Sequence, residues 1–197
     1  MPTSEQTIVK RVTELVAVDS VSSPDLSWDS SNRRVINHLS DYAERDGWAV
    51  DIHELESSAD GKANLIETFG NADNLGDEPA GLVLSGHTDT VPFDAGGWAS
   101  DPLKLTERDG RLYGLGSTDM KGFFAVALEA ASVFDPAKFK APLYLIATAD
   151  EESTMRGARS LTKAQLPVAT AAIVGEPTDP RPMRMHKGIM MQGVTLR

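Results

Sequence analysis

Three short apolar segments in the second half of the chain limit most strongly what it can fold into. They occupy residues 81–85 (GLVLS), 143–147 (LYLIA) and 171–174 (AAIV). Uninterrupted apolar runs of this length are typical of strands that are buried in a parallel sheet. Helical patterns lie between them, at residues 118–134 and 156–164. The alternation predicts an α/β domain of three layers, in which a mixed, largely parallel sheet lies between helices.

The first half of the chain is expected to supply two more helices and two more strands. Thr3 and Gln6 have the spacing of a capping box, and apolar residues follow them at helical intervals. A second helix and two strands are expected at residues 30–45, 48–55 and 63–69. Residues 91–110 contain several Gly and Pro and are expected to form loops.

Composition excludes several classes of protein. The 29 Asp and Glu outnumber the 19 Lys and Arg, giving a net charge of −10, which disfavours nucleic acid and anionic membranes as partners. The chain has no Cys, so a bound metal would have to be held by His, Asp and Glu. No apolar run approaches 18 residues and the first residues lack the pattern of a secretory signal, so a cytoplasmic protein is expected.

Acidic residues follow each of the three apolar segments, and another begins the helix after a glycine-rich turn. In open α/β sheets, ligands bind at the carboxyl ends of the strands. If the three strands are parallel, these side chains meet at one edge of the sheet. The set comprises one imidazole and five carboxylates: His87, Asp89, Asp119, Glu151, Glu152 and Glu176.

Such a set needs a cation if it gathers in one cleft. Two unit charges about 4 Å apart repel by roughly 4 kcal/mol at an effective dielectric constant near 20. A divalent metal is the simplest compensation, and one imidazole with several carboxylates suits Zn²⁺, Co²⁺ or Mn²⁺. Each acidic cluster alone is equally compatible with a solvated loop, and it is their recurrence after three strands that indicates a site.

Other chemistries find less support in the sequence. It contains no dinucleotide fingerprint, no phosphate-binding P-loop, no G-x-S-x-G nucleophile motif and no H-E-x-x-H helix. His38 and His53 are expected to be surface or half-buried residues with structural roles. The roles of His186 and Trp98 stay open, with a cleft-lining position as one alternative for Trp98.

Four motifs in fixed order also carry a family resemblance. The strings SGHTDTVP, YGLGSTDMKGFFA, ATADEES and VGEPT, followed by MHKG, resemble the M20 family of metal-dependent aminoacylases and peptidases. The resemblance implies a catalytic domain like that of zinc exopeptidases, and hydrolysis of the amide bond of an N-acyl amino acid. N-acetyl-L-ornithine, an intermediate of arginine biosynthesis, is the substrate expected first. N-succinyl-diaminopimelate or another acyl amino acid is the alternative, and a non-catalytic binding or scaffold fragment is the alternative of another class.

The resemblance further implies a site for up to two ions of Zn²⁺ or Co²⁺. It assigns one role to each residue of the set: His87 and Glu176 bind the first ion, Asp119 bridges both ions, Glu152 binds the second, Glu151 is the general base, and Asp89 orients the ring of His87.

The resemblance also implies that the domain is incomplete. Residues 1–184 would be the amino-terminal part of the catalytic domain, and residues 185–197 the first strand of a truncated lid and dimerisation domain. We therefore expect these 197 residues to bind at most one metal ion well, to lack useful hydrolytic activity alone and to expose an apolar sheet edge. The full-length protein is expected to be a homodimer.

Overall fold

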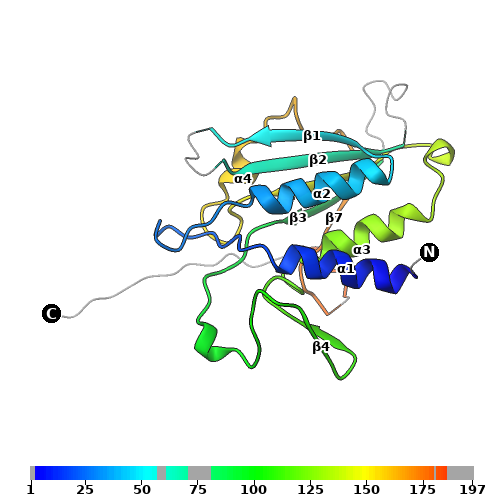
Figure 1. Cartoon of the computed structure of the whole chain (residues 1–197). Coiled ribbons are helices and arrows are strands. Elements are labelled where there is room, and N and C mark those ends of the chain that lie inside the picture. The colour runs from blue at the N-terminus through cyan, green and yellow to red at the C-terminus, as the bar shows by residue number, and fades with distance from the viewer. Residues whose placement is uncertain (1–2, 57–60, 71–80, 180, 186–197) are drawn as a thin grey trace.

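A five-stranded mixed sheet forms the centre of the molecule (Figure 1). The computed structural model describes residues 3–56, 61–70, 81–179 and 181–185. The strands lie in the order β1-β2-β6-β3-β7, in which β3 is parallel to β6 and β7, and β2 is antiparallel to β1 and β6. Their bounds are β1 (Ala49–Glu54), β2 (Ala63–Phe69), β3 (Leu82–His87), β6 (Leu143–Thr148) and β7 (Ala171–Val174).

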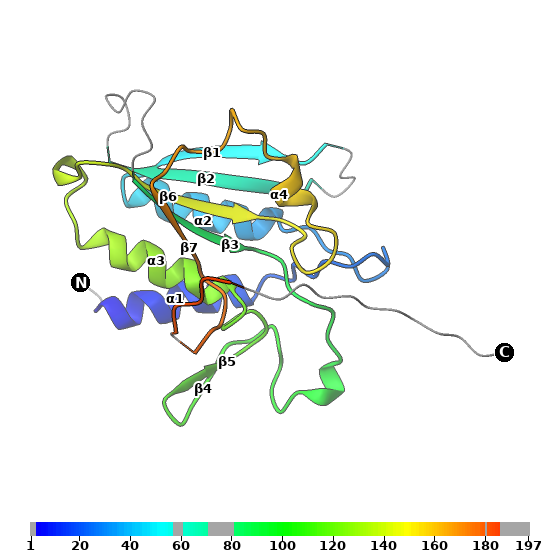
Figure 2. The same cartoon turned by 180° about the vertical axis from the view of Figure 1, so that it is seen from behind.

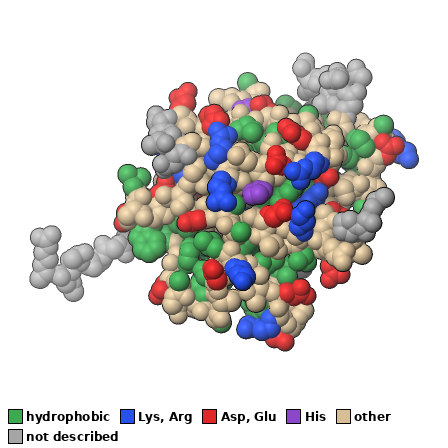
Figure 3. All heavy atoms as spheres, in the orientation of Figure 1, with side chains coloured by type: hydrophobic (Ala, Val, Ile, Leu, Met, Phe, Trp, Pro, Cys, Tyr) green, Lys and Arg blue, Asp and Glu red, His purple; other side chains and the backbone are tan. Residues whose placement is uncertain are grey.

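Three helices cover one face of the sheet: α1 (Ser4–Val16), α2 (Arg33–Arg45) and α3 (Lys121–Ser132). The main core lies beneath them, where Leu15, Ile36 and Phe124 pack with Leu65 and Phe69 of β2. Among the residues that the structure describes, the opposite face is covered by α4 (Arg156–Ser160) and the segment after it, over a smaller apolar cluster (Figure 2). This arrangement confirms the expected α/β fold with a mixed sheet. Acidic and basic side chains are interspersed over the helical face rather than gathered by sign (Figure 3).

The helix starts show why sequence patterns placed some boundaries well and others poorly. The capping box of α1 is present, since the amide of Gln6 donates to Thr3 Oγ1 at 3.3 Å and the amide of Thr3 to Gln6 Oε1 at 3.0 Å. Helix α2 begins at Arg33 rather than residue 30. The Asn32 side chain makes no cap hydrogen bond there, because its Oδ1 already accepts from the amide of Ala63 at 3.1 Å, while its Nδ2 donates to the Ala63 carbonyl at 2.8 Å and to Thr88 Oγ1 at 2.7 Å.

Helix α3 begins at Lys121, not at the expected Ser117 or Thr118. Residues 117–120 instead form a turn, entered from Gly116 at φ +78°, a backbone conformation that favours glycine. The turn brings Asp119 to the sheet edge, and the peptide bond between Asp119 and Met120 is cis. The expected end at residue 134 is also late, since α3 stops at Ser132.

Four further expectations are corrected or fall outside the described residues. The loop expected over 91–110 contains a 3₁₀ turn (Ala95–Gly97) and strand β4 (Thr106–Arg108), which pairs with β5 (Arg111–Tyr113). A second 3₁₀ turn, Pro136–Lys138, follows α3. Helix α4 ends at Ser160 rather than 164, and β7 is exposed along its whole length, not buried, because it is an edge strand with β3 as its one neighbour. The strand expected over 185–196 lies almost wholly outside the described residues.

None of the described helices combines the length and the apolar character that a membrane crossing requires.

Glu67 is an unusual core residue, because it is fully buried on β2, the strand whose Leu65 and Phe69 line the main core. Within the described part of the chain, neither of its carboxylate oxygens has a hydrogen-bond partner. Burial, and next the charge of Asp46, raise the pKa of Glu67 well above its ordinary value, although Arg11 opposes the shift. The folded state therefore favours the protonated form of Glu67.

We expect Glu67→Gln to stabilise the protein at pH 8. A group whose folded pKa is raised contributes stability below its unfolded pKa, and this stability is lost as pH rises through the folded pKa. Unfolding free energy of the native protein should therefore fall between about pH 4.5 and 8, more steeply than that of the variant. Urea unfolding at pH 5 and pH 8 measures this, with an expected gain on the order of 1–3 kcal/mol at pH 8. Equal pH slopes for the two proteins would contradict the assignment to Glu67.

Candidate metal centre

The parallel strands deliver the acidic clusters to one edge of the sheet. Strand β3 ends at His87, which lies opposite Thr148 at the end of β6, and Ser85 lies opposite Val174 at the end of β7. The turns that follow β6 and β7 carry Glu151, Glu152 and Glu176 past this edge, and the turn before α3 adds Asp119. The structure thus brings together all six side chains that the sequence singled out.

The ring of His87 lies at the centre of the cluster and is buried. Its Nε2 atom is 3.1 Å from Asp119 Oδ1, 3.8 Å from Glu176 Oε1 and 4.0 Å from Glu151 Oε2. The carboxylates are more accessible, with 47% of the Asp119 side chain, 40% of Glu176 and 37% of Glu151 exposed. A solvent-accessible rim of carboxylates around a buried imidazole is open to an ion and to a substrate.

Two groups of residues have a geometry that can hold a metal ion. One comprises His87, Asp119 and Glu152, and the other His87, Glu151 and Glu176. Within each group the potential ligand atoms all lie within 4.8 Å of one another. The donor set of nitrogen and carboxylate oxygen suits Zn²⁺ or Co²⁺. The residues present therefore fit a divalent metal, with His87 common to both groups.

Asp89 contacts both the ring of His87 and the backbone amides of Glu151 and Glu152. The Nδ1 atom of His87 lies 3.0 Å from the backbone oxygen of Asp89 and 3.6 Å from its carboxylate. That carboxylate, which is buried, accepts hydrogen bonds from the amides of Glu151 at 3.1 Å and Glu152 at 3.0 Å. Asp89 thus orients both the imidazole ring and the acidic turn after β6, the first mainly through its backbone carbonyl.

Glu152 and Glu176 hold protons more strongly than isolated carboxylates would. Burial and the nearby Asp119 charge raise the pKa of Glu152 to about 7. Burial likewise raises the pKa of Glu176, although the His87 charge opposes this shift. Burial lowers the pKa of His87, but the charges of Asp89, Glu176, Glu151 and Glu152 outweigh it, so the pKa lies above its usual value. These shifts express the mutual repulsion that a cation would relieve.

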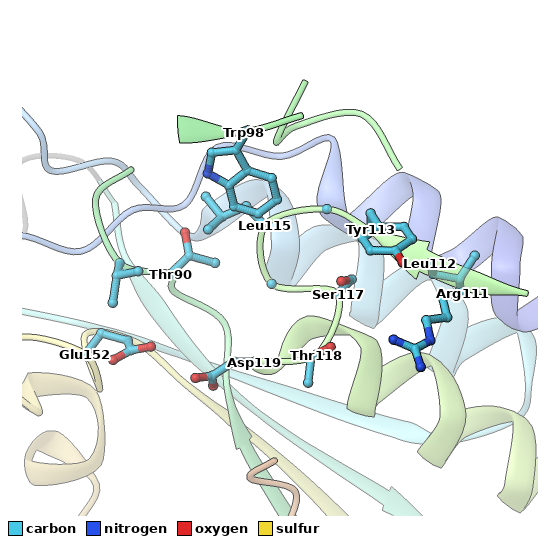
Figure 4. A pocket seen from close by; sticks show the side chains of 13 residues that line it. Thr90, Trp98, Arg111, Leu112, Tyr113, Leu115, Ser117, Thr118, Asp119 and Glu152 are labelled. Atoms are coloured by element: carbon cyan, nitrogen blue, oxygen red, sulfur yellow. The ribbon is translucent and has the colours of Figure 1, made fainter. Parts of the chain in front are cut away.

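A cavity of about 590 Å³ opens beside the cluster (Figure 4). Asp119 and Glu152 lie at one end of its wall, and Arg111 lies toward the other end. Trp98 lines the cavity, which is the cleft position that the sequence left open for it. His38 and His53 are half-buried and away from this edge, as expected, and His186 falls outside the described residues.

Sequence reasoning missed several buried polar residues that support the site. Ser20 donates to the Thr88 carbonyl at 2.8 Å, and the Thr88 hydroxyl donates to the Thr148 carbonyl at 2.9 Å, linking the ends of β3 and β6. Lys62 is also buried, against Asp150. Ser20 and Lys62 lie outside the four motifs, Thr88 lies within one of them but had no predicted role, and none of the three carries a periodic signal. Their roles become visible only when distant segments are seen together.

Several curated proteins similar to this chain are named acetylornithine deacetylase. The chain is 44% identical over 183 residues to an acetylornithine deacetylase of Photorhabdus laumondii, covering 93% of this chain and 46% of that protein. It is 47% identical over 174 residues to one from Pasteurella multocida, with coverages of 88% and 44%. The chain therefore spans about half the length of the curated relatives it matches.

Solved structures support the fold. Human carnosine dipeptidase 1 aligns with 87% of this chain and 38% of its own at a TM-score of 0.68 and 21% identity. An M20 metallo-carboxypeptidase from Sulfolobus solfataricus aligns with 89% of this chain and 37% of its own at a TM-score of 0.64 and 18% identity. The profile of peptidase family M20/M25/M40 matches residues 83–189, the region that contains every residue of the acidic cluster. The chain is thus a member of peptidase family M20/M25/M40.

Proposed function

We propose that this chain supplies the metal centre of an enzyme that hydrolyses N-acetyl-L-ornithine to ornithine and acetate. The observation that carries the proposal is the convergence of three carboxylates on Nε2 of one buried histidine, which together with Glu152 form two sets with metal-binding geometry. The name shared by relatives at 44% and 47% identity supports the substrate. Because the chain spans about half of these relatives, the activity is proposed for the full-length gene product.

In this proposal, His87 and Glu176 would hold one ion, Glu152 would hold the other and Asp119 would contribute to both. Glu151, which also belongs to the group with His87 and Glu176, would keep its carboxylate for proton transfer. When bound, Zn²⁺ or Co²⁺ supplies polarisation of the amide carbonyl and acidifies the attacking water. Glu151 accepts a proton from that water and delivers it to the amine that leaves. Its position supports this role, because its amide is fixed by Asp89 while its half-exposed carboxylate faces the cluster.

One feature of the cavity favours the alternative substrate, N-succinyl-diaminopimelate. Arg111 contributes a guanidinium group to the cavity wall, in the pocket that Asp119 and Glu152 also line. A guanidinium binds carboxylates well, and a succinyl group carries one where an acetyl group does not. Comparing kcat/KM for the two substrates in native protein and in Arg111→Ala separates these alternatives, since loss confined to the succinyl substrate would favour the second.

We further infer the wider setting that these assignments imply. Residues 1–184 would belong to the catalytic domain and residues 185–197 would begin a lid and dimerisation domain, so that the full-length protein is a homodimer. Its place would be in arginine biosynthesis, in the cytoplasm. The exposed edge strand β7, with Ile173 and Val174 half-exposed, is consistent with further packing against the sheet.

The experiment that tests the proposed function is a deacetylation assay with the full-length gene product. Protein treated with a chelator and dialysed should be inactive, and added Zn²⁺ or Co²⁺ should restore release of ornithine. The 197-residue chain assayed in parallel should bind at most one ion per molecule, as measured by elemental analysis, and should show no useful turnover. Activity of the full-length product that survives complete metal removal would overturn the proposal.

A further inference from the structure

We propose that Lys62 is a positioning residue for the metal centre, acting through Asp150 on the turn that carries Glu151 and Glu152. The inference rests on the proposed function, because it concerns how that centre is held. It goes further by assigning a role to a residue outside the four motifs and outside the acidic cluster itself. The interaction that carries it is a buried bridge between three segments of the chain.

The Lys62 side chain is 3% exposed and lies just before β2. Its Nζ atom is 2.6 Å from Asp150 Oδ1 and 2.7 Å from Asp29 Oδ1. The Asp150 side chain is 4% exposed and that of Asp29 is 11% exposed. One ammonium group therefore ties the end of the loop before β2 to the segment before α2 and to the turn after β6. Charge-assisted hydrogen bonds of this length in a buried setting constrain geometry strongly.

Asp150 is the first residue of the turn and has an uncommon backbone conformation, with φ +58°. Non-glycine residues adopt this region rarely, so the surrounding contacts must hold it in place. The Asp150 carbonyl accepts the amides of Thr154 and Met155, which closes the turn. Asp89 holds the amides of Glu151 and Glu152 from the other side. The bridge from Lys62 is the contact that fixes the Asp150 side chain, directly before the two glutamates.

Charge gives a second reason for a lysine at this position. Asp150 would otherwise add one more buried carboxylate beside a cluster that already repels itself. Burial lowers the pKa of Lys62, but the hydrogen bonds and charges of Asp150 and Asp29 outweigh this, so the pKa lies above its usual value. Lys62 is therefore a cation at neutral pH, and it neutralises Asp150 without entering the cavity beside the cluster.

The chain offers a matched control for a merely structural ion pair. Arg11 is likewise a buried cation between two acids, with Nη2 2.7 Å from Asp46 and Nη1 3.7 Å from Glu129. It lies on α1, one of the three helices that cover the sheet, and its two acidic partners are not part of the acidic turn. Removing either cation should destabilise the fold, but only removal of Lys62 should disturb metal binding.

The test compares two double variants in which local charge is conserved. Lys62→Met/Asp150→Asn removes one cation and one anion, and Arg11→Met/Asp46→Asn does the same at the control site. Co²⁺ affinity is measured by calorimetry and by the visible absorption of bound Co²⁺, on the full-length gene product whose folding is verified by urea unfolding. We expect about tenfold weaker Co²⁺ binding for the Lys62 variant, the loss typical when the supports of metal ligands are removed. The Co²⁺ affinity of the control variant should stay within about twofold of that of native protein, because its net charge is equally unchanged and the ion pair it loses does not contact the acidic turn.

The outcomes separate this inference from the proposed function. If native protein binds no Co²⁺, the proposed function fails. If native protein binds Co²⁺ and the Lys62 double variant binds it equally well, the positioning role is wrong. Should that variant fail to fold, Lys62→Arg decides, because it keeps the charge and changes the length of the bridge. Weaker binding supports positioning, and binding equal to native overturns it.

Discussion

Asp119→Ala is expected to abolish metal-dependent hydrolysis in the full-length gene product. The Asp119 carboxylate lies 3.1 Å from Nε2 of His87, belongs to one of the two metal-binding groups and lines the cavity. In the proposed function Asp119 would help to hold both ions, so its removal should cost several kcal/mol of transition-state stabilisation, which corresponds to a loss of about 10³-fold or more in kcat/KM. Ornithine release measures the activity of the variant, and elemental analysis measures its metal content.

The same substitution should leave the fold intact, which distinguishes this result from general damage. The Asp119 side chain is 47% exposed, and its loss relieves repulsion on Glu152 and Glu176. The metal-free variant should therefore unfold at a urea concentration equal to or above that of metal-free native protein. Glu107→Ala, which removes an exposed acid from β4, is the control and should retain activity and metal. Full metal content and activity in Asp119→Ala would contradict the proposed centre.

Glu151→Gln is expected to lower kcat by about 10²–10⁴-fold while metal binding changes little. Glutamine keeps the size of the side chain and the amide that donates to Asp89, but it cannot accept a proton. In the proposed function Glu151 transfers protons, whereas its neighbour Glu152 binds metal. The substrate KM should stay near the native value, because proton transfer contributes in the transition state rather than in the ground state.

Glu152→Gln provides the contrast, since the carboxylate of Glu152 itself belongs to the group with His87 and Asp119. That variant should lose metal affinity first, and excess Co²⁺ should restore part of its activity. Excess Co²⁺ should not restore Glu151→Gln. If both variants respond to Co²⁺ alike, the division of roles between the adjacent glutamates is wrong, although the metal centre itself would stand.

The acidic edge could be predicted from sequence because it depends on a simple rule of strand order. Apolar runs marked β3, β6 and β7, and parallel pairing brings the residues after each run to one edge. The capping box of α1 was equally local, since Thr3 and Gln6 satisfy each other without distant partners. Sequence patterns were therefore sufficient to predict the start of α1, which depends on near neighbours, and the acidic sheet edge, which depends on one topological rule.

Features set by distant partners could not be predicted in this way. Asn32 directly precedes α2 and does not cap it, because its side chain hydrogen-bonds to Ala63 and Thr88 instead. The AAIV run reads as a buried strand, yet β7 lies at the sheet edge with its four residues exposed. Lys62 has no motif around it, and its role depends on Asp29 and Asp150, which are far from it in sequence.

The dispersal of the cluster along the chain has a consequence for how an ion affects stability. His87, Asp119, Glu152 and Glu176 lie at or next to the ends of four different elements, so an unfolded chain cannot present them together. Ion binding therefore acts on the native state alone, and by mass action it adds about 2.7 kcal/mol at a free concentration one hundred times the dissociation constant. The melting temperature should accordingly rise with the logarithm of the metal concentration. Thermal denaturation at several metal concentrations would therefore report whether the ligands come together in the native state.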